Sequence, residues 1–229
     1  MNPSPARPSP FQAILPLCLA LLFMAVASPA APVFRYLEQT GTDSCIFTWR
    51  LERERDTATL SVVQRQGSET FLSRNTAAGE TLAWQYVHQP DTDVRAERED
   101  DRIRLSGRFQ GKTVDEVHAI DDRPWFQPLS FSLRPLALDG QATAEFWTIR
   151  VDTLELVAMR AEAAGREEMD TVRGPRLTAA RVVIRPDGLL GRLWRAEYWF
   201  RAEDGQFIRY RGTHGPPGTP ETVISLLDS

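Results

Sequence analysis

Cysteine is nearly absent from this chain, which has only Cys18 and Cys45 among its 229 residues. Because Cys18 lies in a leader that we expect to be removed, Cys45 has no second cysteine with which to form an intramolecular disulfide. Cys45 begins an alternation with Phe47 and Trp49 on one face of a predicted strand. Since cysteine without a disulfide is among the most buried residue types, we predict that Cys45 packs in the core and is not a nucleophile.

Histidine is also scarce: the three residues His88, His118 and His214 are far apart in the sequence. Their spacing does not match the His-Glu-x-x-His or Cys-x-x-Cys patterns of metal sites. His118 lies in a strand-like run, where we predict a structural role. The chain also lacks a Gly-x-Ser-x-Gly elbow, a glycine-rich phosphate loop and a dinucleotide-binding fingerprint. We therefore predict no metal and no cofactor.

Two carboxylate doublets, Asp121-Asp122 and Glu167-Glu168, remain as candidates for acid–base chemistry. Adjacent residues of a strand point to opposite faces of the sheet, so the members of a doublet do not face one substrate together. Such doublets are also common on solvated surfaces. The sequence therefore predicts a protein that is not an enzyme.

Lysine is almost missing, because Lys112 is the only one among 27 basic residues. The formal net charge is −4, and the two signs are interspersed along the chain. This mild acidity is not typical of proteins that bind nucleic acids or anionic membranes. We expect no nucleic-acid partner, and we expect the scattered arginines to keep one face of the strands solvated.

The longest apolar run, Ala13–Ala27, follows a short polar leader and ends in Ala-Val-Ala. A short apolar core followed by small residues is typical of a cleavable signal peptide. The run is shorter than a comfortable membrane span, although a retained anchor is the alternative. We predict a signal peptide over residues 1–27, cleavage after Ala27 or Ala30, and a single β-rich domain over 28–229. The mature protein would be periplasmic or secreted, with no stable membrane span.

The mature chain is dominated by alternation of apolar and polar residues, which is typical of half-buried strands. Turn signals such as Gln66-Gly67 and Asp204-Gly205 separate these runs at intervals that favour hairpins. The alternating runs include Cys45–Leu51, Leu82–Tyr86, Ile103–Phe109, Trp147–Val151, Val182–Ile184, Trp194–Phe200 and Val223–Leu227. The pattern predicts a mainly β fold built on an antiparallel sheet.

One segment departs from this period. In Trp125–Leu138, Leu129, Leu133 and Leu136 recur at helical spacing, and Pro128 suits a first helical turn. Pro135 should stop the helix, because proline lacks a backbone donor and clashes with the preceding turn. We predict a helix of about two turns that plugs a strongly curved sheet, or half-open β-barrel.

The order of these segments resembles a bacterial envelope family, the domain of unknown function numbered 3108. The likeness covers mainly the second half of the chain, in Pro128–Leu136, Thr178–Ile184, Trp194–Tyr210 and Thr222–Leu227. The family looks related to the periplasmic lipoprotein carriers, whose half-open barrel holds acyl chains around a helical plug. The resemblance implies a plug over Pro128–Arg134 and no catalytic residues to carry over. The apolar loop Asp187–Leu193 departs from a usual hairpin connection, either as a lid or as a segment that packs down.

We predict a non-enzymatic carrier or binding protein for an apolar ligand, such as a lipid or an acyl chain. A hollow beside the plug would hold the ligand, although a fully packed interior is the alternative. An adaptor of a cell-envelope complex, with no small ligand, is the rival function. The residues that we expect to line the hollow are Trp84, Tyr86, Leu129, Leu133, Trp147 and Ile149.

Overall fold

The structure is a computed structural model that describes residues 31–64, 67–188, 194–213 and 219–228. Residues 31–229 form one compact unit. The predictions for the signal peptide and His214, and for most of the loop Asp187–Leu193, lie outside the described residues. Within the described ranges, no helix has the length and apolar character needed to cross a membrane.

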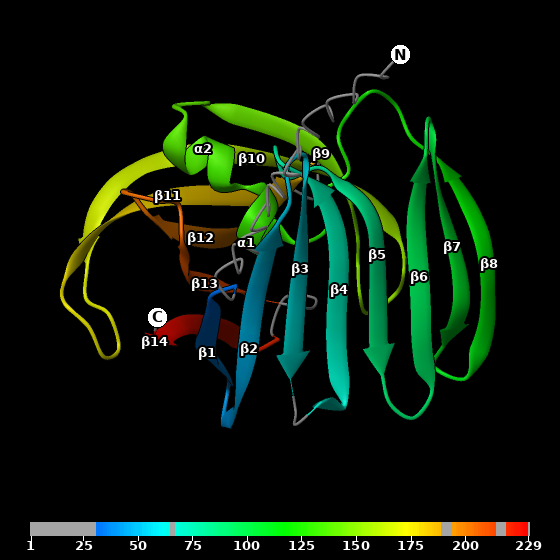
Figure 1. Ribbon diagram of the computed structural model, residues 1–229, viewed down its shortest axis with the longest axis horizontal. Helices are drawn as coiled ribbons and strands as arrows, with labels where there is room; N and C mark the ends of the chain where they lie inside the picture. The colour runs from blue at the N-terminus through cyan, green and yellow to red at the C-terminus, as the bar shows by residue number, and fades with distance from the viewer. Residues whose placement is uncertain (1–30, 65–66, 189–193, 214–218, 229) are drawn as a thin grey trace, which may run out of the picture. The chain divides into compact units, whose positions relative to one another are not determined.

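Fourteen strands form a single antiparallel sheet that is not closed into a barrel (Figure 1). The strands are β1 (Val33–Thr40), β2 (Asp43–Arg53), β3 (Thr57–Gln64), β4 (Glu69–Thr76), β5 (Thr81–His88), β6 (Thr92–Glu99), β7 (Arg102–Phe109), β8 (Lys112–Ala119), β9 (Thr143–Ile149), β10 (Leu156–Met169), β11 (Leu177–Pro186), β12 (Ala196–Arg201), β13 (Phe207–Thr213) and β14 (Glu221–Asp228). The predicted mainly β class and curved antiparallel sheet are confirmed.

The order of the strands explains how the sheet folds back on itself. The chain begins in the middle of the sheet at β1 and adds hairpins outward to β8 at one edge. It then crosses to the opposite edge, and β9 to β14 return to the middle, where β14 pairs with β1. We call β1–β8 the first arm of the sheet and β9–β14 the second arm. The segment that crosses from β8 to β9 contains the predicted plug and lies between these two arms.

The plug consists of two short helices, α1 (Leu129–Ser132) and α2 (Arg134–Leu138). The predicted stop at Pro135 is only half right. The first helix ends before this residue, but Pro135 then lies in the first turn of α2. Proline is tolerated there because the first backbone N–H groups of a helix have no intrahelical partner.

Hydrogen bonds fix the plug to the first arm of the sheet. The Ser132 hydroxyl donates to the Gly79 carbonyl at 2.5 Å, and the Trp49 indole N–H donates to the Ser130 hydroxyl at 3.1 Å. Gly79 has a φ of +95°, and a Cβ atom there would lie 2.9 Å from the Cα atom of Ser132. The close approach of the plug therefore requires glycine in the turn between β4 and β5.

A seam joins the two arms of the sheet through residues 124–127. The Thr81 N–H of β5 donates to the Trp125 carbonyl at 2.7 Å, and the Phe126 N–H donates to the Trp147 carbonyl of β9 at 2.8 Å. The Gln127 side chain donates to the Ile149 carbonyl at 2.8 Å and accepts from the Ile149 N–H at 2.9 Å. This amide therefore satisfies the edge of β9 as a neighbouring strand would.

Removing the Gln127 amide should loosen the seam. We expect Gln127→Ala to lower the free energy of unfolding by about 2 kcal/mol, because two buried backbone groups of Ile149 lose their partner. Chemical denaturation followed by circular dichroism measures the change. Gln85→Ala is the control, since Gln85 donates only to exposed Asp93, at 2.8 Å, and should cost under about 0.5 kcal/mol. Equal losses in the two variants would contradict the role of the seam.

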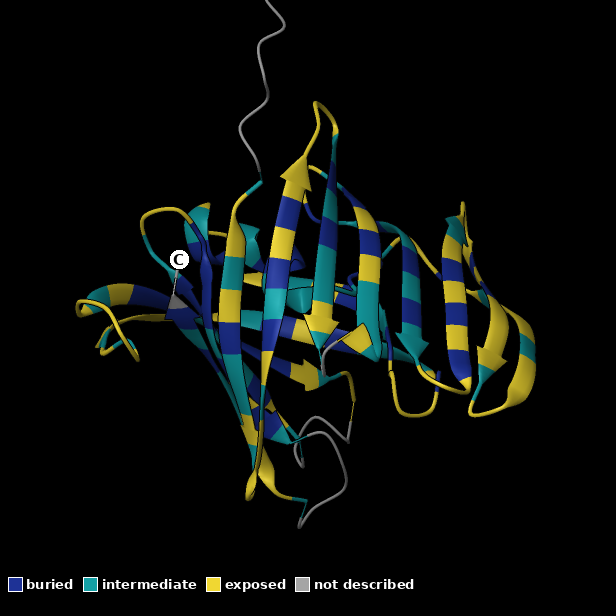
Figure 2. Ribbon diagram, turned by 60° about the horizontal axis from the view of Figure 1, so that its bottom comes forward, coloured by how far each residue is buried: buried dark blue, intermediate teal, exposed yellow. Residues whose placement is uncertain are grey.

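Two apolar clusters fill the interior, and Figure 2 shows buried and exposed residues alternating along the strands that enclose them. The first cluster surrounds the plug and includes Tyr36, Phe47, Trp49, Leu133, Leu136, Phe146, Phe200 and Phe207. The second lies between the first arm, the seam and β9, and it includes Trp84, Tyr86, Val94, Ile103, Leu105, Trp125, Ile149 and Leu154.

Candidate functional site

The inner face of the sheet changes character along the strands. On β2 the inward side chains of Leu51, Trp49 and Phe47 are buried, whereas Cys45 at the other end is only half-buried. The neighbouring strands repeat this change: Leu60 is buried, and Val62 and Gln64 are half-buried. The plug covers one end of the inner face, and the opposite end is left partly open to solvent.

We call this second end the inner mouth and define it by eight half-buried, inward-facing residues. The register of paired strands places them in two groups. Tyr198, Ile224 and Glu38 follow one another through buried Tyr210 on β12, β13, β14 and β1. Val62 pairs with Phe71, and Gln64, Glu69 and His88 pair in turn across β3, β4 and β5. The apolar and aromatic members are Val62, Phe71, Tyr198 and Ile224, and the polar members are Glu38, Gln64, Glu69 and His88.

Polar side chains of the mouth are linked by hydrogen bonds. The Gln64 amide donates to a Glu38 carboxylate oxygen at 3.4 Å, which connects β3 to β1 across β2. The Tyr86 hydroxyl donates to Glu69 Oε1 at 3.2 Å and lies 3.5 Å from His88 Nδ1. Tyr86 also stacks on Phe71, with ring centroids 4.7 Å apart. The mouth therefore combines aromatic surface with fixed hydrogen-bonding groups.

Two tyrosines form the other side of the mouth. Tyr198 of β12 pairs with Tyr210 of β13, and their rings meet edge to face at a centroid separation of 5.1 Å. Burial raises the pKa of both phenols, and the nearby Glu38 carboxylate raises that of Tyr210 further. The Tyr198 hydroxyl has no hydrogen-bond partner among the described residues. Both phenols are therefore neutral at physiological pH, and one has an unused donor.

Only one of the six residues predicted to line a hollow reaches the mouth. Leu133 belongs to the first cluster and is 0% exposed, and half-buried Leu129 packs against that cluster. The other four predicted residues, Trp84, Tyr86, Trp147 and Ile149, belong to or pack against the second cluster. Tyr86 alone extends its hydroxyl into the mouth. The structure therefore does not bring the predicted set together around one space.

The sequence patterns missed the polar members of the mouth. Glu38 continues the inward phase of Tyr36, and Gln64 continues that of Val62, but both are polar ends of apolar alternations. A polar residue at the inward phase of a strand is the signal that could have found them. That signal becomes useful only when the strand register places these ends beside each other.

The prediction that Cys45 is a core residue needs correction. Cys45 does lie on the inward face of β2, as predicted, because Phe47 on the same face is buried. Cys45 itself is only half-buried. The strand runs past the end of the packed core, so its first residues reach the mouth. His118 lies on edge strand β8, and its Nε2 atom is 3.1 Å from Glu116 Oε2.

The carboxylate doublets lie on the outside of the protein. Exposed Asp121 accepts hydrogen bonds from Arg123 and from the Trp147 indole, which hold the pKa of its carboxyl far below the ordinary value. Arg123 also lies over the Trp147 ring, 4.2 Å from its centroid. Glu167 accepts a hydrogen bond from the Trp199 indole. Within the part of the chain that the structure describes, no three metal-ligating side chains form a metal site.

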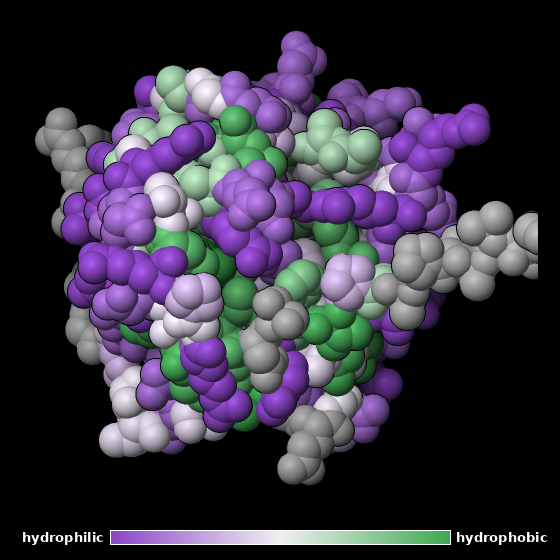
Figure 3. Space-filling view, turned by 60° about the vertical axis from the view of Figure 1, so that its left-hand side comes forward, coloured by the Kyte–Doolittle hydropathy of each residue, from purple (hydrophilic) through white to green (hydrophobic). Residues whose placement is uncertain are grey.

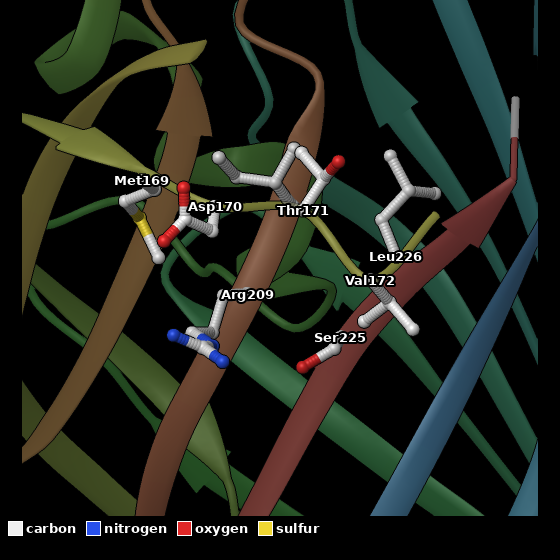
Figure 4. A pocket seen from close by; sticks show the side chains of 8 residues that line it. Met169, Asp170, Thr171, Val172, Arg209, Ser225 and Leu226 are labelled. Atoms are coloured by element: carbon white, nitrogen blue, oxygen red, sulfur yellow. The ribbon is translucent and has the colours of Figure 1, made fainter. Parts of the chain in front are cut away.

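Two cavities lie on the outer face of β12 to β14. One, of about 240 Å³, is bordered by Trp194, Arg195, Glu197, Arg211 and Glu221. The other, of about 20 Å³, lies where Met169–Val172 crosses β13 and β14 (Figure 4). The smaller cavity has room for about one water molecule. Both are smaller than the roughly 300 Å³ at which ordinary small-molecule sites begin.

Hydrophobic side chains also reach the outer surface. Ile46, Val63 and Leu72 follow one another diagonally across β2, β3 and β4, and they are 49%, 36% and 46% exposed. Figure 3 shows hydrophobic patches separated by hydrophilic side chains on one side of the molecule. We call Ile46, Val63 and Leu72 the outer stripe.

Comparisons with known proteins show the fold. No family model and no curated protein matches the chain. The crystal structure of a β-barrel-like protein of the domain of unknown function DUF1849 from Brucella abortus is similar, with a TM-score of 0.53 and 10% identity. The match covers 87% of this chain and 99% of that one.

The hypothetical lipoprotein YmcC from Escherichia coli (K12) is a more distant likeness, with a TM-score of 0.45 and 11% identity. That match covers 86% of this chain and 85% of the other. The match to the DUF1849 protein supports a barrel-like fold, and membership of the family numbered 3108 is not shown.

Proposed function

We propose that the protein is a non-catalytic binding or carrier protein of the cell envelope, and that its inner mouth holds the apolar part of a lipid-like ligand. The observation that carries the proposal is the inner face itself. Beyond the plug, the side chains of Val62, Tyr198 and Ile224 remain half-buried, although they pack against the first cluster. An apolar ligand would bury the rest of their surface, and this burial supplies binding free energy.

The location of the site differs from the hollow that the sequence predicts. Leu133 and Leu136 of the plug are buried in the first cluster, so the end of the sheet that holds the helices is occupied by the protein's own side chains. A ligand chain would therefore enter from the mouth and lie against the aromatic rings of the inner face. The leader, an exported location and the absence of catalysis belong to this proposal.

Neighbouring valines on opposite faces of β3 offer a matched test. The unmodified protein should bind N-phenyl-1-naphthylamine, a neutral probe whose fluorescence rises in apolar surroundings, in a saturable manner. Val62→Asp should weaken binding by about tenfold or more, because a carboxylate in the mouth must be desolvated by the probe. Val63→Asp is the control, since Val63 lies on the outer face, and it should bind as the unmodified protein does.

Circular dichroism establishes that both variants are folded. Equal binding by both variants would place the probe elsewhere, and no saturable binding by the folded unmodified protein would reject the carrier function.

The outer stripe supports the second candidate, an adaptor that docks a protein partner of the envelope. Exposed aliphatic side chains in an unbroken diagonal are a feature of interaction surfaces. The same two variants separate the candidates. If the adaptor is correct, Val63→Asp reduces recovery of a cross-linked partner from the envelope fraction, while Val62→Asp has no effect.

A further inference from the structure

We propose that the open edge of β8 pairs with the same strand of a second copy of this chain, so that two molecules share one continuous antiparallel sheet. The inference goes beyond the proposed function, because β8 lies at the edge of the sheet, three strands away from β5 and the inner mouth. It rests on backbone groups that the edge leaves without partners and on the order of side chains along β8.

The two edges of the sheet differ in how they are covered. At β9, the Trp147 N–H donates to the Pro124 carbonyl at 2.9 Å, and the Gln127 side chain bonds both backbone groups of Ile149. Among the described strands, β8 pairs with β7 alone (Figure 1). Its register is regular along its whole length, and it contains no proline. A straight edge strand without a bulge, a proline or a covering segment is a template for pairing with another chain.

The hydrogen-bonding phase of β8 shows which of its backbone groups are free. The Ile120 N–H donates to the Asp101 carbonyl at 2.8 Å, directly beyond the last pair of the β7–β8 ladder. Bonded and unbonded pairs alternate along antiparallel strands, so the even-numbered residues of β8 bond to β7. The backbone groups of the odd-numbered residues point away from β7, and they have no partner in the described ranges. These residues are Thr113, Asp115, Val117 and Ala119.

One two-fold register satisfies both these backbone groups and the side chains. Residues with free backbone groups must face each other, and Val117 can lie opposite Val117 of the second copy. The same register sets Glu116 opposite His118 of the second copy, and Val114 opposite Ile120. Val117 is 51% exposed in the single chain, so the pairing would bury apolar surface. An imidazole N–H can donate to a carboxylate whether or not the ring is charged.

The neighbouring two-fold registers are less favourable. A register centred on Glu116 would place its carboxylate opposite the same carboxylate of the second copy, and one centred on Asp115 would do the same. A register centred on His118 would place Asp115 opposite Asp121. Like charges directly opposite each other destabilise paired strands. The sequence of β8 therefore favours Val117 at the two-fold axis.

Opposite charges at residue 117 test the pairing and its register together. Sedimentation velocity of the full chain, expressed with its leader, should show a dimer whose fraction rises with protein concentration. Val117→Lys and Val117→Glu should each weaken dimerisation by about tenfold, because each variant meets its own charge at the two-fold axis. An equimolar mixture of the two variants should recover the dimer, since opposite charges then face each other.

Val33→Lys is the matched control. Val33 is also 51% exposed, but it lies on β1 in the middle of the sheet, so this variant should dimerise as the unmodified protein does. Circular dichroism establishes that all variants are folded. An unmodified chain that stays monomeric at every concentration would overturn the inference and leave the edge to an extended segment of another protein. Equal dimerisation by Val117→Lys and Val33→Lys, or a mixture that fails to recover the dimer, would also overturn it.

Discussion

Replacing Trp125 by alanine is expected to lower the free energy of unfolding by about 4 kcal/mol, the largest loss for a single side chain in this protein. Trp125 is 0% exposed and lies in the second cluster, between the first arm of the sheet and β9. Its indole also donates to Gln127 Oε1 at 3.1 Å, so the variant loses a contact that orients the seam. The cavity would lie where the two arms meet, and neither arm can close it without moving the other.

Differential scanning calorimetry measures this effect. For a chain of this size, a loss of about 4 kcal/mol corresponds to a decrease in Tm of about 12 °C. Trp194→Ala is the matched control, because Trp194 is half-buried and its indole donates only to the Thr213 carbonyl, at 2.7 Å. The control should lose about half as much stability, since the half-buried Trp194 side chain buries less apolar surface than Trp125 does and its removal therefore costs less. A Trp125→Ala protein that melts no earlier than the control would contradict the role of the seam.

Gly107→Ala is the second change with a large expected effect. Gly107 of β7 has a φ of +124°, and a Cβ atom there would lie 2.1 Å from the Asp93 carbonyl oxygen of β6. Both the backbone conformation and the contact exclude a side chain, so strands β6 and β7 must separate locally. We expect a loss of about 3 kcal/mol in the free energy of unfolding.

A second glycine provides the control for backbone conformation. Gly111 has a φ of +77°, but a Cβ atom there would have no neighbouring atom within 4 Å. Gly111→Ala should therefore cost only about 1 kcal/mol, the penalty of the left-handed conformation. Urea denaturation of the two variants compares them directly. Equal losses would mean that the close approach of β6 to Gly107 has no energetic consequence.

The fold could be predicted from the sequence because alternation with a period of two is a local signal. Phe47, Trp49 and Leu51 mark one buried face of β2, and the leucines after Pro128 mark a helix of different period. Pro135 misled the prediction of the plug, since its effect depends on whether a helix continues or begins at that residue.

The binding site could be predicted only in part, because alternation does not reveal which other residues share a space. On β9, Phe146 packs in the first cluster and Ile149 in the second, so both faces of this strand are covered. Trp147 and Ile149 therefore do not face the plug leucines, although their apolar character is right. Glu38 and Gln64 meet only through the register of β1, β2 and β3.

Native mass spectrometry of the full chain, expressed with its leader and purified from the envelope fraction without detergent, tests the carrier function most directly. We predict a population whose mass exceeds that of the polypeptide by one lipid-like molecule, and that this population is lost in Val62→Asp but kept in Val63→Asp. Only the bare polypeptide mass in every folded sample, from an envelope extract in which lipids are detected, would contradict the account.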